Sequence, residues 1–353
     1  MESIIKKNKK IAIIYHNHCY DGAYAAINAF LYYKHFTNDK YNLIDFIPLM
    51  NIYPLFIKVN MVYDKIVCLD LGIRDEDINF LNDKKNEETS IVLFDHHSYW
   101  SEKYNKEYKE KLKDRKKLKI FYDDKNTRSA CGMTFDYYKK KAISKKDIDK
   151  NLVEEIFNSN LKRINDYIED SDTGHFKIKD IHEFKSALAS KIQLYLTTDF
   201  SQETDQRINI FLNLNLSYLI KIGKKCLNKI KYQTKKILKK NWIYIVELKG
   251  GYKFLMCISE EKYVRNYACP LLAKISKKKG YLPVGAFVFS YTDILYKFSM
   301  RTYDDLYDVS KLAQIYGGGG HKGAAAFEMD YDGIDSLIVD TIDIYKDIET
   351  TEI

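Results

Sequence analysis

No stretch of this sequence approaches the ~18 consecutive apolar residues that a membrane-spanning helix needs, so we expect no transmembrane segment. A secretion signal is also missing from the N-terminus. Its basic residues are followed by the short apolar run IAIIY, with no small-residue cleavage site after it. A cleavable presequence would have to lie almost wholly outside this chain, and we therefore expect a cytoplasmic protein.

Paired cysteines are lacking as well. The six cysteines form no CxxC pair and no spacing typical of a disulfide framework. Most of them lie in apolar segments, which favours a reducing compartment over an oxidising one. They are Cys19, Cys68, Cys131, Cys226, Cys257 and Cys269.

The charge balance is too weak to identify a partner. The 57 Lys and Arg residues against 49 Asp and Glu give a formal net charge of +8 over 353 residues. This excess is compatible with phosphate-bearing partners, but a solvated lysine-rich surface accounts for it more simply. The length is sufficient for two domains with sizeable cores.

The first third of the chain alternates between apolar runs and helical patterns. Residues 11–15, 65–73 and 90–97 are short apolar runs, and segments with helical spacing or capping residues follow the first two. Strands that are apolar on both faces and alternate with helices are typical of a parallel sheet covered on both sides. We predict an α/β fold with a mostly parallel N-terminal sheet flanked by helices.

The middle of the chain predicts helices. Residues 101–118 are nearly all polar and read as a solvated excursion, and helices are predicted over 129–141, 148–168 and 205–240. The last of these has a lysine-rich face in its second half. That face could contact nucleic acid, although a connecting helix with a solvated face is the simpler interpretation.

From residue 242 the pattern changes to strand, Gly-Gly turn and strand, then a helix, a second hairpin and a short helix before GGGGHKGAAAF. This pattern predicts a smaller C-terminal α+β domain. We divide the chain into an N-terminal domain over 1–190, a helical linker over 191–241 and the second domain over 242–353.

Polar side chains follow each of the three predicted strands. They are His16, His18, Cys19 and Asp21 after the first strand, Asp70 after the second, and Asp95, His96 and His97 after the third. Because the carboxyl ends of parallel strands meet at one edge of a sheet, we expect these side chains to share a crevice. A further acidic cluster, YIEDSDTGHF, contains Glu169, Asp170, Asp172 and His175.

A crevice with several carboxylates and imidazoles needs neutralising charge. A single aspartate at a strand end is usually a helix cap or a salt-bridge partner, and a structural ion-pair network is the alternative for the whole cluster. A pair of divalent cations neutralises such a cluster well, and carboxylates with imidazoles suit Mn²⁺, Mg²⁺ or Zn²⁺. Two ions ~3.5–4 Å apart polarise a phosphate oxygen and lower the pKa of a bound water. The pattern therefore favours a metal site.

Five motifs, in order, resemble the DHH phosphoesterase superfamily. FDHH (94–97) matches its signature, YHNHCYDGAYAA (15–26) resembles its first motif, and the segments with Asp70 and Asp170 resemble its second and fourth. FSMRTYDDLYDVSKLAQIYGGGGHKGAAAF is similar to the DHH-associated C-terminal domain, with its Arg and GGGH loop. The resemblance implies a metal-binding catalytic domain, a substrate-binding domain and a cleft between them, as in nanoRNases, pAp phosphatases and related phosphodiesterases.

The resemblance also implies roles for individual residues. Asp95 is expected to bridge two metal ions, His97 to contact the scissile phosphate or a metal-bound group, and Asp95, His96 and His97 to form the catalytic centre. The implied metal ligands are His16, Asp21, Asp70, Asp95, His96 and Asp170. Asp172 is the close alternative to Asp170, and Asp166 would replace it in another register.

The first motif departs from the family pattern, because many members have a second Asp near the position of Asp21. Here Cys19 lies two residues before it and Ala23 two after. Either Cys19 or His18 substitutes as a ligand, or one metal is held more weakly, or Cys19 is simply a buried residue. A thiolate suits Mn²⁺ or Zn²⁺ better than Mg²⁺.

The second domain is expected to bind the substrate's phosphates. Glycines allow positive φ, and their N–H groups can converge on an anion. Arg301 could make a bidentate phosphate contact, assisted by Ser299 on the same strand face. The expected binding residues are Arg301, Gly317, Gly318, Gly319, Gly320, His321 and Lys322.

We therefore predict a divalent-metal-dependent hydrolase, with two Mn²⁺ ions expected and Mg²⁺ or Zn²⁺ as alternatives. It would cleave phosphodiester or phosphomonoester bonds of short single-stranded oligonucleotides, as an exonuclease does, or of small nucleotides, with a water activated by two metals. A homodimer is compatible with the sequence. The alternatives are a polyphosphate (phosphoanhydride) hydrolase and a nucleic-acid-binding protein with a weakened active site.

Overall fold

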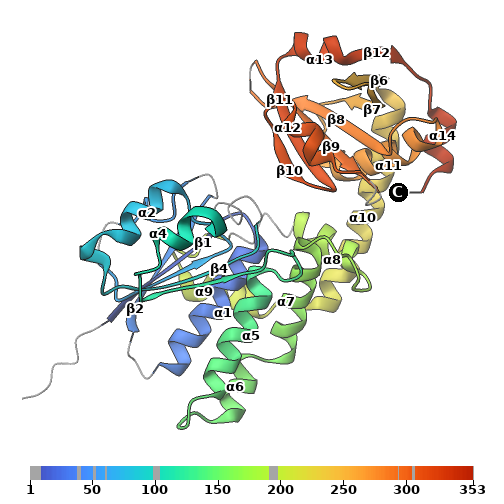
Figure 1. Ribbon diagram of the computed structural model, residues 1–353. Coiled ribbons are helices and arrows are strands. Elements are labelled where there is room, and N and C mark those ends of the chain that lie inside the picture. Colours follow the sequence, from blue (N-terminus) through green and yellow to red (C-terminus); the bar gives the residue numbers. More distant parts are fainter. Residues whose placement is uncertain are drawn as a thin grey trace, which may run out of the picture. The chain divides into compact units, whose positions relative to one another are not determined.

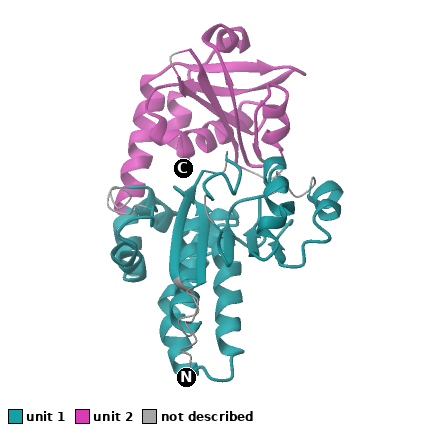
Figure 2. Ribbon diagram, turned by 90° about the vertical axis from the view of Figure 1, so that its left-hand side faces the viewer, with its two compact units in different colours: residues 1–224 teal, residues 225–353 magenta. Residues whose placement is uncertain are grey.

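The computed structural model describes residues 9–37, 41–50, 53–59, 62–97, 104–190, 198–292, 294–303 and 307–352. The chain divides into two compact units, residues 1–224 (unit 1) and 225–353 (unit 2), coloured separately in Figure 2. The boundary falls inside the long helix α10 (Leu216–Lys240). Among the described residues we find no helix with the length and apolarity that a membrane span requires.

Unit 1 contains a five-stranded parallel sheet with strand order β2-β1-β3-β4-β5 (Figure 1). The strands are β1 (Lys9–His16), β2 (Tyr41–Leu49), β3 (Lys65–Leu69), β4 (Ser90–Asp95) and β5 (Leu118–Tyr122). The three predicted strands form the centre of this sheet, and the prediction of a parallel α/β fold is confirmed. The order reverses between β1 and β3, which is where ligands bind in open α/β sheets.

The two edge strands, β2 and β5, were not predicted. The strand β2 contains Asp45 and Pro48, and β5 follows the polar stretch that the sequence assigns to solvent. Proline cannot donate a ladder hydrogen bond and is tolerated at an edge, so these strands lack the continuous apolar pattern of the centre.

The central strands are buried on both faces. Ile11, Ile13 and Tyr15 of β1 belong to one apolar core, and Ala12 and Ile14 belong to another on the opposite face. The first core is shared with α1 (Tyr20–Phe36), α5 (Ala130–Ile143) and α7 (Ser159–Asp172). The second includes side chains of α2 (Asp75–Asn82). Burial on both sides explains why these strands read as continuous apolar runs.

Two predicted helices are each divided in the structure. The segment 148–168 forms α6 (Lys150–Ile156) and α7, which are separated where the Asn158 side chain accepts a hydrogen bond from Leu161 N and caps α7. The segment 205–240 forms α9 (Thr204–Leu212) and α10, and Asn215 Oδ1 accepts from Tyr218 N at the start of α10. Asparagine side chains end and begin helices in this way because they compete for backbone donors.

The remaining helical segments of unit 1 are short. The polar stretch predicted to be a solvated excursion contains a π-helical turn (Tyr104–Tyr108) followed by α4 (Lys109–Lys111). A 3-10 turn (Lys84–Asn86) follows α2, and α8 (Ile181–Ala189) follows α7.

Unit 2 contains a seven-stranded mixed sheet with strand order β10-β11-β9-β8-β7-β6-β12. Its strands are β6 (Ile243–Leu248), β7 (Tyr252–Ile258), β8 (Val284–Ser290), β9 (Tyr296–Thr302), β10 (Gly319–His321), β11 (Ala324–Met329) and β12 (Ile338–Thr341). Both predicted hairpins, β6–β7 and β8–β9, are antiparallel.

The helices of unit 2 cover both faces of its sheet. The helix α11 (Arg265–Lys278) follows a 3-10 turn (Lys262–Val264) and connects the parallel strands β7 and β8. It shares one apolar core with α14 (Tyr345–Thr350), whereas α12 (Val309–Gln314) and α13 (Tyr331–Leu337) belong to the core on the other face. The unit is therefore the α+β domain that the sequence predicts.

A close approach at Gly22 brings the first motif against the sheet. A Cβ added to Gly22 would lie 2.4 Å from the backbone oxygen of His16, so only glycine lets α1 begin so near the end of β1. This approach places Asp21, in the first turn of α1, beside the side chains that end β1 and β3.

Candidate metal centre

All of the polar side chains predicted to share a crevice except His18 lie together at the carboxyl edge of the unit 1 sheet. His16 ends β1, Asp95 ends β4, and Asp70 directly follows β3 with a φ of 59°. The Asp70 N–H donates to Phe94 O at 2.8 Å, which holds the left-handed residue against β4. Positive φ is uncommon for a non-glycine residue and is found where function or packing requires it.

The described part of the chain contains three overlapping groups of residues that could bind a metal. Within each group the ligand atoms lie within 4.8 Å of one another. The groups are His16, Cys19 and Asp70; Asp70, His96 and His97; and Asp21, His96 and Asp172. Asp70 belongs to the first two groups and His96 to the last two. This overlap is the arrangement that two adjacent ions sharing ligands would require.

The atoms shared by these groups are buried without a hydrogen-bond partner. Asp70 Oδ1 and His96 Nε2 lie 3.5 Å apart, and neither makes a hydrogen bond. His96 Nε2 also lies 3.0 Å from Asp172 Oδ2 and 3.7 Å from Asp21 Oδ2. An unsatisfied buried polar atom costs about 1–3 kcal/mol, and a divalent cation would satisfy both atoms. The donor set of carboxylates and imidazoles therefore fits Mn²⁺, Mg²⁺ or Zn²⁺.

The pKa values of several of the clustered aspartates and histidines are strongly shifted because the groups are buried close together. Burial, together with the charges of Asp70 and Asp172, raises the pKa of Asp21 to about 7. Burial alone would raise the pKa of Asp70 too, but the hydrogen bond with His16 and the ion-pair contact with His96 outweigh it and lower this pKa. Burial disfavours the charged histidines, yet carboxylates raise the pKa of His96 to about 12 and that of His97 to about 9. Without metal, protons on the imidazoles neutralise the carboxylates.

The N-terminus of α5 holds Asp21 in place. Ala130 N donates to Asp21 Oδ2 at 2.9 Å, and Cys131 N donates to Asp21 Oδ1 at 2.8 Å. These are first-turn amides of α5, which have no partner inside the helix and favour a negative charge. Each carboxylate oxygen has a second lone pair, so the same contacts that orient Asp21 leave it able to bind a cation.

Asn126 orients His96, and the sequence analysis missed it. Its Nδ2 donates to Thr173 O at 3.1 Å, which turns its Oδ1 toward His96 Nδ1 at 2.8 Å. His96 Nδ1 must then carry a hydrogen, and Nε2 is the nitrogen that faces the carboxylates and offers a lone pair to a metal. The only sequence signal is a polar turn, DDKNTR, after an unpredicted strand, and Asn126 has a φ of 51°.

Two aspartates two residues apart on α7 face different partners. Asp170 Oδ1 and Oδ2 accept hydrogen bonds from Lys177 N at 3.0 Å and Ile178 N at 2.9 Å. Asp172 instead reaches His96. The structure thus brings Asp172 into the cluster, whereas the carboxylate of Asp170, the ligand expected first, orders the segment that follows α7.

The remaining N-terminal candidates differ in position. Asp95 is fully buried and lies in none of the three groups, and its Oδ1 is 2.7 Å from His97 Nδ1. Cys19 lies beside His16 and Asp70, and burial followed by the charge of Asp70 raises the pKa of its thiol well above the usual value. His18 is exposed, has a φ of 60° and belongs to none of the groups.

In unit 2, Arg301 is held by neutral oxygens. Its Nη1 donates to Ser299 Oγ at 3.2 Å and to Met300 O at 2.8 Å, and its Nη2 donates to Asn266 Oδ1 at 3.3 Å. No carboxylate among the described residues forms an ion pair with it, so its charge is available to an anion. Ser299 lies next to it as the strand alternation predicts.

The first glycines of the run make backbone hydrogen bonds that end α12. Gly317 N and Gly318 N donate to the carbonyls of Gln314 and Ala313 and so terminate α12. Gly317 has a φ of 76° and Gly320 a φ of 145°, conformations that favour glycine. Gly319 and His321 belong to β10, Lys322 is exposed, and the side chain of His321 lies outside the described residues.

Comparisons with known proteins find distant relatives. No family model matches the chain. Uncharacterized protein R106 of Acanthamoeba polyphaga mimivirus is 24% identical over 338 residues, which cover 92% of this chain and 68% of R106.

Among solved structures, PggH of Vibrio cholerae, a pGpG-specific phosphodiesterase, matches with a TM-score of 0.48 at 11% identity, covering 93% of this chain and 96% of PggH. An exopolyphosphatase-related protein of Bacteroides fragilis matches with a TM-score of 0.47 at 12% identity, covering 97% and 92%. The DHH domain of a member of the S1p family of ribosomal proteins matches with a TM-score of 0.48 at 14% identity, covering 94% and 85%.

The motifs lie where the resemblance predicts: the first at the end of β1, the second after β3 and FDHH at the end of β4, with the glycine run in a separate α+β unit. The α/β fold and the placement of the motifs at the strand ends are as predicted, and membership of the DHH phosphoesterase superfamily stays a prediction from the motifs. What this chain acts on has to be argued from its own site.

The contrast between Asp172 and Asp170 gives a first prediction. Asp172→Ala should weaken Mn²⁺ binding by more than about 10-fold with little change in thermal stability, because its side chain is partly exposed and contacts only the cluster. Asp170→Ala should instead destabilise the fold by about 2 kcal/mol, since two backbone donors lose a charged acceptor. Calorimetric titration and thermal unfolding of both variants measure this, and the reverse pattern would make Asp170 the ligand.

Asn126 gives a second prediction. Asn126→Ala frees the His96 ring to rotate, and Mn²⁺ affinity should fall about 10–100-fold. Asn241→Ala removes a comparable side-chain donor to a backbone carbonyl far along the chain, Ile237 O, and serves as the matched control. Unchanged affinity in Asn126→Ala would show that packing alone orients His96.

The protonation of the cluster gives a third prediction. The raised pKa values of His96 and His97 mean that both rings are protonated in the metal-free protein at neutral pH. A cation at His96 Nε2 must displace a proton, so Mn²⁺ binding near pH 7.5 should release about one proton or more, and affinity should rise as pH increases toward about 9. Titrations in two buffers of different ionisation enthalpy count these protons. Zero release with a pH-independent affinity would contradict the assignment.

Proposed function

We propose that this chain is a divalent-metal-dependent phosphoesterase that hydrolyses phosphodiester or phosphomonoester bonds of short oligonucleotides or small nucleotides. The observation that carries the proposal is the pair of buried, unsatisfied atoms Asp70 Oδ1 and His96 Nε2 at the centre of three overlapping ligand groups. Neither atom forms a hydrogen bond, although His96 Nε2 lies within ion-pair distance of the carboxylates of Asp21, Asp70 and Asp172, and a cation among these groups would satisfy both atoms.

The geometry supports a particular set of ligands. Asp70 lies in two of the groups and would serve both cations, whereas His96 offers a lone pair only at Nε2 and would bind one of them. The proposed ligands are His16, Asp21, Asp70, His96 and Asp172, with Cys19 as a further ligand for Mn²⁺ or Zn²⁺. Asp95, expected from the sequence to bridge the metals, would act by holding His97 through the 2.7 Å contact.

Bound cations would supply Lewis-acid polarisation of a phosphate oxygen and favour deprotonation of a water. The chain's own residues would position the reacting groups. The α5 amides fix Asp21, and Asn126 fixes the tautomer of His96. The partly exposed ring of His97, held by Asp95, would donate a hydrogen bond to the scissile phosphate.

The substrate class follows from unit 2. Arg301 presents a guanidinium without an ion pair in the described structure, and a planar, five-donor group of this kind suits phosphate. We assign substrate binding to Arg301, Lys322 and His321, with Gly317, Gly318, Gly319 and Gly320 shaping the turn that presents them.

The test is hydrolysis by chelator-treated protein after Mn²⁺ is restored. The panel contains a dinucleotide, a pentanucleotide, pAp, a cyclic dinucleotide and tripolyphosphate. We expect turnover of a nucleotide substrate that is lost again on chelation, and His96→Ala should lower kcat/KM more than about 100-fold because it removes a metal ligand. His35→Ala, an exposed histidine at the end of α1, is the matched control.

Different outcomes separate the alternatives. Turnover of tripolyphosphate alone would replace the proposal with a phosphoanhydride hydrolase. Nucleotide binding without turnover of any substrate would indicate a binding protein with a weakened site. Full activity in His96→Ala would show that the reaction occurs elsewhere.

A further inference from the structure

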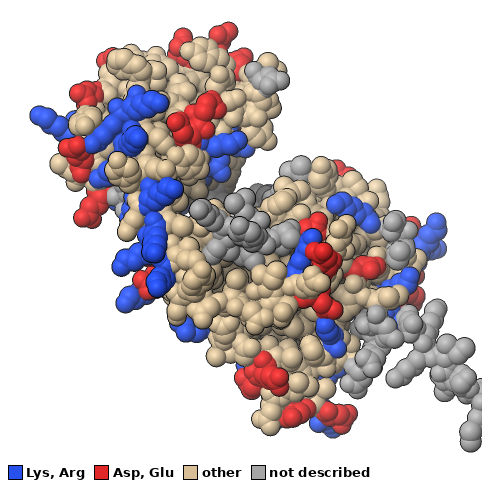
Figure 3. All heavy atoms as spheres, turned by 180° about the vertical axis from the view of Figure 1, so that it is seen from behind, with Lys and Arg blue, Asp and Glu red and all other residues tan. Residues whose placement is uncertain are grey.

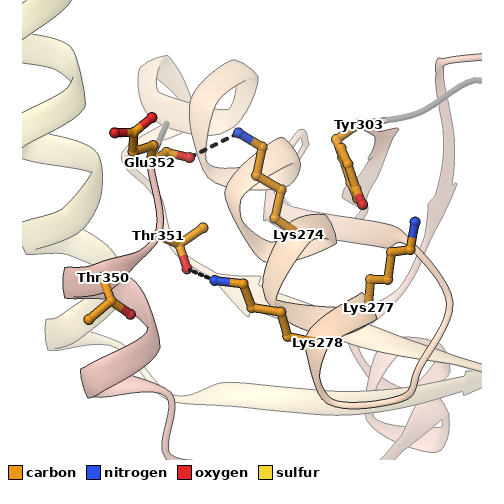
Figure 4. A pocket seen from close by; sticks show the side chains of 7 residues that line it. All are labelled: Lys274, Lys277, Lys278, Tyr303, Thr350, Thr351 and Glu352. Atoms are coloured by element: carbon orange, nitrogen blue, oxygen red, sulfur yellow. Dashed lines mark hydrogen bonds between the residues drawn. The ribbon is translucent and has the colours of Figure 1, made fainter.

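Two hollows on unit 2 are lined by lysines, and we call them the lysine hollows. The first has a volume of about 460 Å³ and lies between α11, Tyr303 and residues 350–352 (Figure 4). Its lysines are Lys274, Lys277 and Lys278. The second has a volume of about 510 Å³ and is lined by Lys231, Tyr232 and Lys235 of α10. Glu352 borders both hollows.

Three of these lysines contact neutral oxygens. Lys274 Nζ donates to the backbone oxygen of Glu352 at 3.0 Å, and Lys278 Nζ donates to Thr351 Oγ1 at 3.0 Å, as drawn in Figure 4. Lys235 Nζ donates to the backbone oxygen of Glu349 at 3.1 Å. Within the described residues, none of these three ammonium groups has a carboxylate in ion-pair distance.

The nearby acids are already paired. Glu349 forms its ion pair with Lys239, and Asp347 forms one with Lys279 at 2.9 Å. Among the described residues, Glu352 is the single carboxylate lining either hollow. The lysine hollows therefore keep an excess of positive charge, and Figure 3 shows basic side chains gathered along α10.

The spacing of the lysines brings their positive charges close together. Lys231 and Lys235 are four residues apart on α10, and Lys274 and Lys278 are four residues apart on α11. Like charges at this spacing lie on one helix face and repel each other. An anion bound between them would remove the repulsion, so the arrangement favours an anionic ligand.

Each hollow also presents an aromatic ring. Tyr232 is 70% exposed and Tyr303 is 39% exposed. The ammonium of Lys277 lies 5.4 Å from the centre of the Tyr303 ring. Single strands bind to surfaces that combine a basic track for the backbone with aromatic side chains on which bases stack. A free phosphate would need the lysines but not the rings.

The C-terminal end of α14 offers a simpler explanation for part of the pattern, because helix carbonyls attract cations. It explains Lys235, which contacts a carbonyl of that helix, and Lys274, which contacts a carbonyl just beyond it. It does not explain Lys278, which contacts a side-chain hydroxyl, or the exposed tyrosines.

We propose that the lysine hollows bind the phosphodiester backbone of a single-stranded nucleic acid, with Tyr232 and Tyr303 stacking on its bases. The contact surface is provided by α10, α11 and Tyr303, and its lining includes neither Arg301 nor the glycine run. Binding here needs no hydrolysis, so the proposal stands or falls independently of the proposed reaction.

The test is fluorescence anisotropy of a labelled oligothymidylate of about 12 nucleotides with the full chain, in chelator to prevent turnover. Affinity is measured between about 50 and 200 mM NaCl. Lys274→Ala/Lys278→Ala should weaken binding about 10-fold and reduce the salt slope by about 1.4, since each contact to a single-strand phosphate contributes about 0.7. Tyr232→Ala should weaken binding about 5-fold or more with the slope unchanged, because stacking releases no counterions.

The matched control is Lys253→Ala/Lys297→Ala, which removes the same charge from lysines of unit 2 that are paired with Glu247 and Glu328. Equal losses in both double variants would reduce the effect to net charge and overturn the proposal. Unchanged oligonucleotide affinity in Lys274→Ala/Lys278→Ala would also overturn it. So would binding to phosphatidylserine vesicles that this variant loses while oligonucleotide affinity persists.

Discussion

The close approach of Asp70 and His96 is the constraint on which unit 1 depends. Two polar atoms buried 3.5 Å apart without hydrogen bonds are costly, and they persist only if the surrounding structure is rigid enough to hold them. The parallel strands supply that rigidity, because they are covered by apolar cores on both faces. The left-handed conformation of Asp70 is one visible cost of placing its carboxylate at the sheet edge.

The elements around the sheet hold the cluster from several sides. The first turn of α5 binds both oxygens of Asp21, Asn126 fixes the orientation of His96, and Asp170 orders the segment after α7, the helix that also presents Asp172. None of these contacts involves a metal. They determine where the donor atoms point before any cation arrives, and such preorganisation is what a site selective for a small, hard cation needs.

The charged groups of unit 2 that we assign to binding are cationic, whereas those of unit 1 are mainly carboxylates. In unit 1, carboxylates are crowded until protons or cations must neutralise them. In unit 2, Arg301, Lys274 and Lys278 donate hydrogen bonds to neutral oxygens, and no carboxylate of the described residues forms an ion pair with them. Crowded carboxylates attract cations, and cations without an ion-pair partner attract anions such as phosphate.

The sequence by itself determined the central strands and the motif residues at the strand ends. Apolar runs and turn residues act over a few neighbours and can be read locally. It did not determine the edge strands, the role of Asn126 or the choice between Asp170 and Asp172. Residues two apart on a helix point about 200° apart, so only the packing of α7 against its neighbours decided which carboxylate reaches His96.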